Sequence, residues 1–259
     1  MLDFITERAS VRDFDPEKKI PEKIAKHILL AGSSAPSAGN IQPRTFIIIE
    51  DKKIKDQLYE LCEDQAFMKD APLWIVVCAD IHRHLIAAKL TGVDYDFTGI
   101  LPFTFSVLDA ALSLENMVIA AEALGLGSVI IGSVIEHPQK AKHILNLPNH
   151  TLALSILCVG YPKKKPSRRM KWNYEVIVCK DHYRTIDRND VLQYWKRFLF
   201  SDLKCLGKAT SLDKVEKLIL EGKQPDYGKA YSNHYKEDFI RRTNKKLAEF
   251  LRSQGFIRE

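Results

Sequence analysis

Four short apolar runs, each with the length of a buried β-strand, constrain the fold of this chain more than any other feature. They are rich in β-branched residues and are bounded by proline, glycine or polar residues. The four runs are Thr45–Ile49, Leu73–Ala79, Ser128–Ile131 and Leu154–Val159. Apolar residues spaced three and four apart predict helices at Pro21–Ala31, ending at Gly32, and around Ile54–Cys62. Strands and helices therefore alternate, and we expect a domain of mixed α and β structure.

The longest helical pattern, Phe105–Leu124, is apolar around almost its whole circumference and closes with Gly125 and Gly127. A helix without a polar face must be covered on every side. We therefore expect this segment inside the protein or within a subunit interface. Asp109 and Glu122 interrupt the apolar region, and a lipid-embedded helix would expose these charges at high cost, so no membrane span is predicted.

The amino-terminal residues and the cysteines both indicate a reducing compartment. Asp3 lies among the first residues and no apolar stretch typical of a secretory signal follows, so a cytoplasmic location is expected. The five cysteines are an odd number and show no Cys-x-x-Cys spacing. Cys78 and Cys158 fall inside strand-like runs, which favours small buried side chains over nucleophiles.

The net charge of +6 is concentrated in two places. Residues 201–259 carry 13 Lys or Arg against 9 Asp or Glu, and residues 1–200 carry 26 against 24. Within the larger part, six basic residues lie in the acid-free stretch Lys163–Lys171. The remainder of that part is net acidic, which argues against a surface that coats nucleic acid. A local anion site and a basic tail are expected instead.

The carboxy-terminal part of the chain has few long apolar runs. Its helical patterns, Asp213–Leu220 and Phe239–Leu251, bring too few apolar residues for an independent core. We expect a main domain over residues 1–198 and a helical extension over residues 199–259 that packs on that domain or on a partner subunit.

Several common catalytic signatures are missing from the sequence. The glycine-rich run Gly125–Gly132 has neither the third glycine of a dinucleotide-binding turn nor the lysine of a phosphate-binding loop. There is no His-Glu-x-x-His pattern, and His82 and His84 are too closely spaced to indicate a metal site, so no metal is expected. No Gly-x-Ser-x-Gly elbow indicates a serine nucleophile.

Arg8, Ser10 and Arg12 alternate near the amino terminus. In an extended segment this spacing places two guanidinium groups and one hydroxyl on the same side. Guanidinium groups bind phosphate oxygens through paired hydrogen bonds, and the hydroxyl adds a neutral donor. Taken alone, the segment is better explained by solvated arginines at a helix end.

A second segment, Ala35–Pro43, joins a predicted helix to a predicted strand with small side chains and exposed backbone amides. Small residues let a planar ligand approach the main chain, and Asn40 and Gln42 offer the donors and acceptors that a heteroaromatic ring requires. An ordinary turn-rich connection is an equal alternative. The basic stretch Lys163–Lys171 follows Gly160–Pro162, and a solvated loop or a nucleic-acid patch would explain it equally well.

Together and in this order, these segments resemble the nitroreductase family of FMN-dependent NAD(P)H oxidoreductases. The R-x-S-x-R-x-F pattern at Arg8–Phe14 is similar to the family's FMN-phosphate segment, and Ala35–Pro43 is similar to its flavin-ring segment. Ala121–Gly132 resembles the helix-to-strand passage beneath the ring. Gly160–Pro162 followed by Lys165–Arg169 resembles the closing element that returns a basic side chain to the phosphate.

The resemblance implies an α+β fold with a mixed sheet flanked by helices, in an intertwined homodimer with two FMN sites at the subunit interface. Hydride would pass from NADPH or NADH to flavin N5, near the backbone of Ile131 and Gly132. Electrons would then pass to a small-molecule acceptor, such as a nitroaromatic compound or a quinone, in a ping-pong reaction without a catalytic side chain. The implied cofactor-binding residues are Arg8, Ala9, Ser10, Arg12, Pro36, Ser37, Ala38, Asn40, Gln42, Ile131, Gly132, Arg168 and Arg169.

The sequence departs from the family pattern at Arg44, where many members have tryptophan. Lys165 is an alternative to Arg168 and Arg169 at the phosphate, and Lys69 is a candidate for the positive charge near the N1–C2=O edge of the flavin. A flavin-dependent reductive dehalogenase or flavin-processing enzyme of the same fold is the alternative function. A basic nucleic-acid-binding protein that uses Lys163–Lys171 is a more remote alternative.

Overall fold

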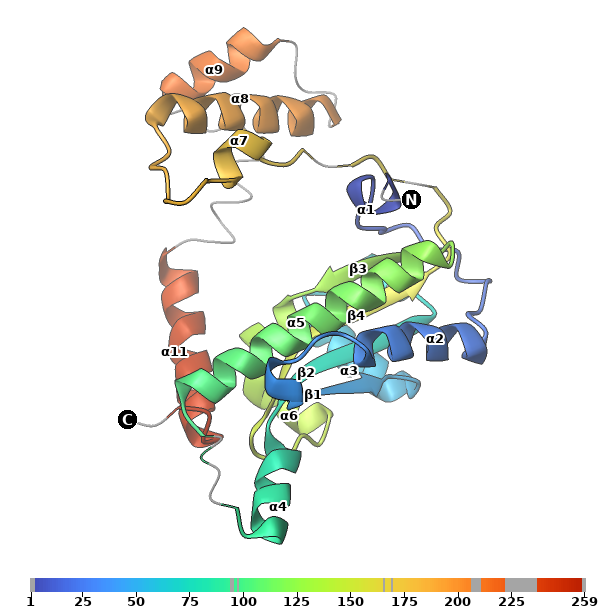
Figure 1. Ribbon diagram of the computed structural model, residues 1–259. Helices are drawn as coiled ribbons and strands as arrows, with labels where there is room; N and C mark the ends of the chain where they lie inside the picture. Colours follow the sequence, from blue (N-terminus) through green and yellow to red (C-terminus); the bar gives the residue numbers. More distant parts are fainter. Residues whose placement is uncertain are drawn as a thin grey trace. The chain divides into compact units, whose positions relative to one another are not determined.

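In the computed structural model, the four predicted strands form one sheet in the order β1-β2-β4-β3 (Figure 1). These strands are β1 (Arg44–Ile48), β2 (Leu73–Asp80), β3 (Gly127–Ile131) and β4 (Thr151–Gly160). All three pairings are antiparallel, and a register shift between Val77 and Cys78 marks a bulge in β2 against β4. The α+β class is confirmed. The parallel pairing that a mixed sheet requires is not among the strands described within one chain.

The structure describes residues 3–93, 96, 98–164, 166–168, 170–205, 211–221 and 237–257. The chain divides into two compact units, residues 1–166 with 243–259 and residues 167–242. The first unit contains the sheet. The expected domain boundary at residue 198 falls within the second unit and stays a prediction.

Alternate residues of the central strand β2 face two separate cores. Trp74 and Val76 belong to one buried cluster, and Ile75 and Val77 belong to the other. Side chains of a strand alternate between the two faces of a sheet, so a strand covered on both faces must be apolar throughout. This explains why β2 is a continuous apolar run in the sequence.

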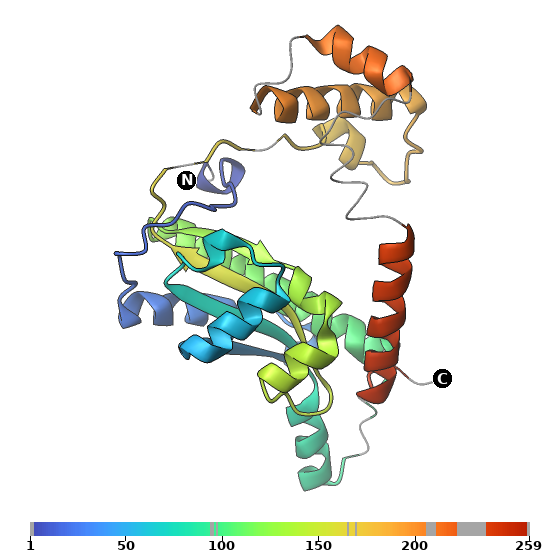
Figure 2. The same ribbon diagram turned by 180° about the vertical axis from the view of Figure 1, so that it is seen from behind.

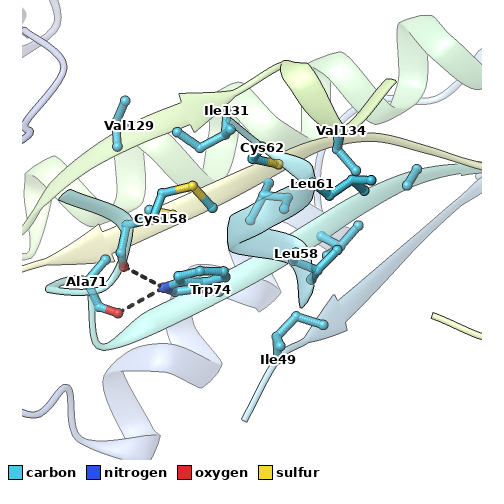
Figure 3. Packing of buried hydrophobic residues seen from close by; sticks show 14 of the residues in the cluster. Ile49, Leu58, Leu61, Cys62, Ala71, Trp74, Val129, Ile131, Val134 and Cys158 are labelled. Atoms are coloured by element: carbon cyan, nitrogen blue, oxygen red, sulfur yellow. Dashed lines mark hydrogen bonds between the residues drawn. The ribbon is translucent and has the colours of Figure 1, made fainter. Parts of the chain in front are cut away.

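The first core lies between the sheet and helices α3 (Lys52–Leu61) and α6 (Pro138–Ile144), which Figure 2 shows from behind. Trp74 is its largest fully buried side chain, and the indole Nε1 donates to the carbonyls of Met68 and Ala71 at 3.0 Å each (Figure 3). The indole N–H is therefore satisfied inside an otherwise apolar cluster.

The second core lies between the sheet and helices α2 (Glu22–Ser33) and α5 (Ile100–Ala123). The prediction that Gly32 ends α2 is wrong, because the helix continues through it to Ser33. A Cβ at Gly32 would lie 2.7 Å from Cγ of Met117 on α5. This glycine therefore permits close packing of the two helices.

The two faces of helix α5 differ in the size and polarity of their residues. The face toward α2 and the sheet is buried and consists largely of small or polar residues, including Ser106, Asp109, Ala110, Ser113, Met117 and Ala121. Large apolar residues on the outer face are exposed, and we call them the outer stripe: Leu101, Phe105, Leu108 and Leu112. Within the described part of the chain, α5 alone has the length and apolar composition of a membrane-crossing helix. One chain thus covers only one side of it.

Helix α5 ends in a turn that Gly125 makes possible. Gly125 has a φ of +75°, and the N–H of Leu126 donates to the carbonyl of Ala121 at 2.9 Å. This pair of features defines a Schellman motif, in which a glycine takes the left-handed conformation just past the helix. The turn leads directly into β3.

The end of α11 (Glu237–Ser253) packs on the first unit. Phe250, Leu251 and Phe256 form a buried cluster with Ile81 and Leu152. Residues at the carboxy-terminal end of the chain therefore contribute to the fold of the sheet-containing unit.

The second unit contains α7 (Tyr174–Ile177), α8 (Arg188–Cys205) and α9 (Leu212–Leu220). The last two helices pack together, with an ion pair between Lys196 on α8 and Glu216 on α9. The helical patterns predicted in this part of the sequence are confirmed.

Candidate functional site

The predicted phosphate segment, Arg8–Phe14, runs beside the sheet. The N–H of Val11 donates to the carbonyl of Ser128 at 3.0 Å, and Phe14 forms an antiparallel bridge with Pro162. Val11 and Phe14 are buried. Their side chains hold the segment in place, and the bridge to Pro162 joins it to the Gly160–Pro162 element.

The polar residues of the segment lie between and beyond these anchors. Arg8, Ser10 and Arg12 lie outside regular secondary structure, after α1 (Asp3–Thr6) and the turn residue Glu7. Arg8, Ala9 and Ser10 are half-buried and Arg12 is exposed. Two guanidinium groups and a hydroxyl are therefore carried at accessible positions on one short segment.

The loop between α3 and β2 links this segment to the end of β3. The guanidinium of Arg12 lies 5.6 Å from the ring centroid of Phe67 in η2 (Ala66–Met68). Two residues earlier, Nε2 of Gln65 donates to the hydroxyl of Ser133 at 3.2 Å. One loop thus contacts both the predicted phosphate segment and the residue that follows Gly132.

Lys69, the candidate for a positive charge at the flavin, lies at the end of the same loop. It is exposed, and Nζ is 3.9 Å from the ring centroid of Tyr59. Its ammonium group makes a cation–π contact with that ring. Its role near the flavin stays a prediction.

The backbone after β3 is open to an approaching group. Ile131 is buried, whereas Gly132 is exposed, and a Cβ built on Gly132 would have no atom within 4 Å. η3 (Ser133–Glu136) begins immediately afterwards. A planar ring can therefore lie against the main chain here without meeting a side chain.

The predicted ring segment, Ala35–Pro43, is a tight loop that contains η1 (Ala38–Asn40). Asn40 and Gln42 both have φ values in the left-handed region, +57° and +56°, which few residues other than glycine and asparagine adopt. Their side chains are exposed, and Nε2 of Gln42 donates to Oδ1 of Asn40 at 3.0 Å. The loop presents this amide pair outward.

Two buried charges lie beneath the loop. Nη1 of Arg44 is 3.5 Å from Oδ2 of Asp109, and each side chain is only 3% exposed. Burial lowers the pKa of Arg44 from its ordinary value, and the nearby Asp109 carboxylate opposes that shift. Asp109 also accepts a hydrogen bond from the N–H of Ala38 at 3.2 Å.

One chain does not bring all the predicted residues together. Ala35–Pro43 leads into β1, and Gly132 follows β3, and these are the outer strands on opposite edges of the sheet (Figure 1). Three inter-strand spacings of about 4.8 Å separate the outer strands by roughly 14 Å. The predicted residues therefore form two groups, one near each edge.

The basic residues of the closing element are described only in part. Lys165 and Arg169 lie outside the described residues. Arg168 is exposed and belongs to the second unit. Their roles at the phosphate stay predictions.

Sequence reasoning missed Asp109 and the role of Arg44. Asp109 was noticed only as an interruption of an apolar helix, and Arg44 only as a departure from a family pattern. Arg44 and Asp109 carry opposite charges at positions expected to be apolar. Because buried charges in proteins are usually paired, these two charges were the signal from which their contact could have been predicted.

Comparison with known proteins identifies the family to which the chain is similar. The model of the nitroreductase family matches residues 5–161. The chain is 32% identical over 185 residues to "FMN reductase [NAD(P)H]" of Bacillus subtilis, covering 71% of this chain and 74% of that protein. It is 26% identical over 255 residues to "Oxygen-insensitive NADPH nitroreductase" of Salmonella typhimurium, covering 98% and 97%.

The fold comparison extends over the whole chain. The solved structure of B. megaterium NfrA2 has a TM-score of 0.85 and 26% identity, and it covers 100% of this chain and 98% of its own. Since the family model matches more than half of the sequence, the protein belongs to the nitroreductase family.

Proposed function

We propose that this protein is an FMN-dependent NAD(P)H oxidoreductase that reduces nitroaromatic compounds, quinones or similar small acceptors. The observation that carries the proposal is the placement of Arg8, Ser10 and Arg12 on one anchored segment, linked through a single loop to the open backbone at Gly132. The names of the relatives, an FMN reductase and an NADPH nitroreductase, support it.

The donor set fits the chemical groups of FMN. Arg8 and Arg12 would neutralise the phosphate, and the Ser10 hydroxyl would donate to it. The open main chain at Gly132 would lie against the isoalloxazine ring, and Asn40 and Gln42 would offer amide donors and acceptors to the ring or the ribityl chain. When bound, FMN supplies the chemistry that accepts hydride from NADPH or NADH and reduces the acceptor.

We further propose a homodimer with an FMN site at each end of its interface. Two observations support this: the predicted residues form two groups at opposite edges of one sheet, and the outer stripe of α5 is exposed in one chain. A second copy would cover the stripe. Its Ala35–Pro43 loop would then lie beside the predicted phosphate-binding residues of the first copy. Exposed apolar stripes of this kind mark interaction surfaces.

Two further points support a cytoplasmic enzyme over a nucleic-acid-binding protein. Cys62, Cys78, Cys158 and Cys179 are free thiols, which suits a reducing compartment. At the start of the basic stretch, the N–H of Lys163 donates to the carbonyl of Asp13 at 2.9 Å, so this lysine extends the pairing of the phosphate segment.

The absorbance spectrum of the purified protein tests the proposal directly. We expect a yellow protein, or a colourless one that takes up FMN, whose visible band bleaches when NADPH or NADH is added without oxygen and returns with a nitroaromatic compound or a quinone. A protein that binds no flavin would refute the proposal. Bleaching without turnover of either acceptor, but with dehalogenation or flavin breakdown, would favour the alternative flavin enzymes.

A further inference from the structure

Asp109 is a buried carboxylate that the predicted cofactor contacts do not include. It lies on the inner face of α5 and is 2% exposed. Oδ1 accepts from the N–H of Ala38 at 3.2 Å, and Oδ2 accepts from the hydroxyl of Ser37 and lies 3.5 Å from Nη1 of Arg44. A buried carboxylate is costly unless such partners satisfy it. Two of its three partners, Ser37 and Ala38, belong to the predicted ring segment, and the third, Arg44, follows that segment directly.

Arg44, the other member of this ion pair, is held in place by hydrogen bonds to the backbone. Nη2 donates to the carbonyls of Ser33 and Ala35 at 2.9 Å each. Ser33 is the last residue of α2, where carbonyls lack partners within the helix and a cation is favoured. Arg44 thus joins the end of α2, the start of β1 and, through Asp109, the middle of α5.

Ser37 transmits this anchoring to the rest of the loop. Its O–H donates to Asp109, and its oxygen accepts from the N–H of Gln42 at 2.6 Å. Gln42 in turn donates through Nε2 to Asn40. The single hydroxyl hydrogen of Ser37 is used inside the protein, so the hydroxyl has no hydrogen left to donate to a ligand.

We propose that Asp109, paired with Arg44, is a positioning residue for the flavin ring, and that Ser37 relays its effect to Asn40 and Gln42. Asp109 holds Ala38 through its backbone N–H, and Ser37 holds Gln42 through its backbone N–H. Together these bonds sustain the left-handed conformations at Asn40 and Gln42. The flavin part of this inference rests on the proposed function, whereas the anchoring of the loop does not.

Hydrogen exchange of the flavin-free protein tests the anchoring. In S37A, the amide of Gln42 loses its acceptor, and we expect its exchange to become about tenfold faster or more. In D109N, the amide of Ala38 should accelerate as well. D80N is the matched control, because Asp80 is another buried carboxylate at the same end of the sheet and bonds the hydroxyls of Thr45 and Thr151. Unchanged exchange at Ala38 and Gln42 in both variants would overturn the proposal.

Binding of FMN and of riboflavin tests the positioning of the ring. Since the loop acts on the ring and leaves the phosphate segment intact, S37A should weaken both ligands about tenfold and in equal proportion, with a weaker visible circular dichroism of the bound flavin. Loss of a phosphate contact, as expected in R8A, should weaken the binding of FMN and leave the binding of riboflavin unchanged. Wild-type affinity of S37A for both ligands would contradict the relay.

A double variant separates positioning from stability. D109N leaves a buried guanidinium unpaired and can fail to fold, whereas R44M/D109L replaces both charges by apolar side chains, an exchange that buried pairs often tolerate. We expect R44M/D109L to fold, with fast exchange at Ala38 and weak binding of both flavins. If R44M/D109L folds and binds both flavins normally, the pair is only structural. A wild-type protein that binds no flavin would refute the proposed function, while the exchange data would still decide the anchoring.

Discussion

At the scale of single residues, Val11 and Gly127 determine where the phosphate segment lies. A Cβ at Gly127 would be 2.3 Å from Cγ2 of Val11, so the first residue of β3 must lack a side chain for Val11 to occupy its position. From there the N–H of Val11 reaches the carbonyl of Ser128, and Arg12 follows one residue later. Gly127, which is not among the predicted cofactor-binding residues, therefore positions Ser10 and Arg12, the two predicted phosphate-binding residues on either side of Val11.

We expect G127A to destabilise the protein by about 1–3 kcal/mol, because the added methyl group overpacks the contact with Val11. FMN should also bind more weakly, since Ser10 and Arg12 shift with Val11. Urea unfolding and fluorescence titration with FMN measure the two effects. V11A in the same chain should restore part of both losses by making room, and a G127A protein with wild-type stability and affinity would contradict this account.

The guanidinium groups themselves give a second residue-scale prediction. R8A and R12A should each lose a charge-assisted hydrogen bond worth roughly 1.5–3 kcal/mol, which corresponds to about 10- to 150-fold weaker FMN binding. K18A removes an exposed charge that pairs with Asp15 and serves as the control. Equilibrium dialysis or fluorescence quenching provides the measurement. Unchanged affinity in both arginine variants would remove these residues from the site.

At the scale of elements, the end of α11 is held by contacts around His150. The carbonyl of His150 accepts from the N–H of Ile81 at 3.1 Å, and a Cβ at Gly255 would lie 2.6 Å from Cε1 of the imidazole. Burial lowers the pKa of His150, and the nearby positive charges of His82 and Lys142 add to the effect. The packed state therefore favours a neutral imidazole.

This gives a pH dependence of known sign. The unfolded chain protonates His150 near pH 6.5, whereas the folded protein resists protonation until a lower pH, so stability falls as the pH drops below about 6.5. We expect H150N, which tolerates the φ of +64°, to show a smaller fall in Tm between pH 7.5 and pH 5. H182N, at an exposed position, should retain the wild-type dependence. Equal slopes in H150N and the wild type would exclude His150 as a source.

The sequence predicted the strands well because each is locally defined. Residues 73–79 are apolar at every position, and their short length and β-branched residues favour a strand covered on both faces. Gly125 ends α5 as predicted, since its left-handed conformation is a property of that one residue. Gly32 misled the prediction because its function depends on Met117, a residue on another helix that no local pattern reveals.

The candidate site was predictable to the extent that its residues are adjacent in the sequence. Arg8, Ser10 and Arg12 form a short motif on one anchored segment, and their phosphate roles stay predictions. The pair of Arg44 and Asp109 joins residues that are 65 positions apart, and its geometry depends on how β1 and α5 pack. Local spacing carries no information about such a contact.

At the scale of the whole molecule, the outer stripe of α5 should decide the oligomeric state. If the proposed dimer forms through this stripe, we expect L108K to make the protein monomeric, because a lysine buried in that interface would lose its hydration. Light scattering coupled to size-exclusion chromatography measures the mass, and L90K on α4 (His82–Thr91) is the control at a fully accessible leucine. If L108K remains a dimer, the subunits associate through another surface.

Asp109 and Leu108 are neighbours on α5. Asp109 bonds the Ala35–Pro43 loop, whereas Leu108 belongs to the outer stripe. If two copies associate through the outer stripe, as proposed, a rotation or shift of α5 would be transmitted through Asp109 to the loop that is proposed to hold the ring. FMN binding and subunit association then become linked equilibria. If FMN binds the dimer more tightly than the monomer, FMN also favours formation of the dimer. The apparent affinity for FMN should consequently rise with protein concentration, and dilution should release cofactor and subunits together.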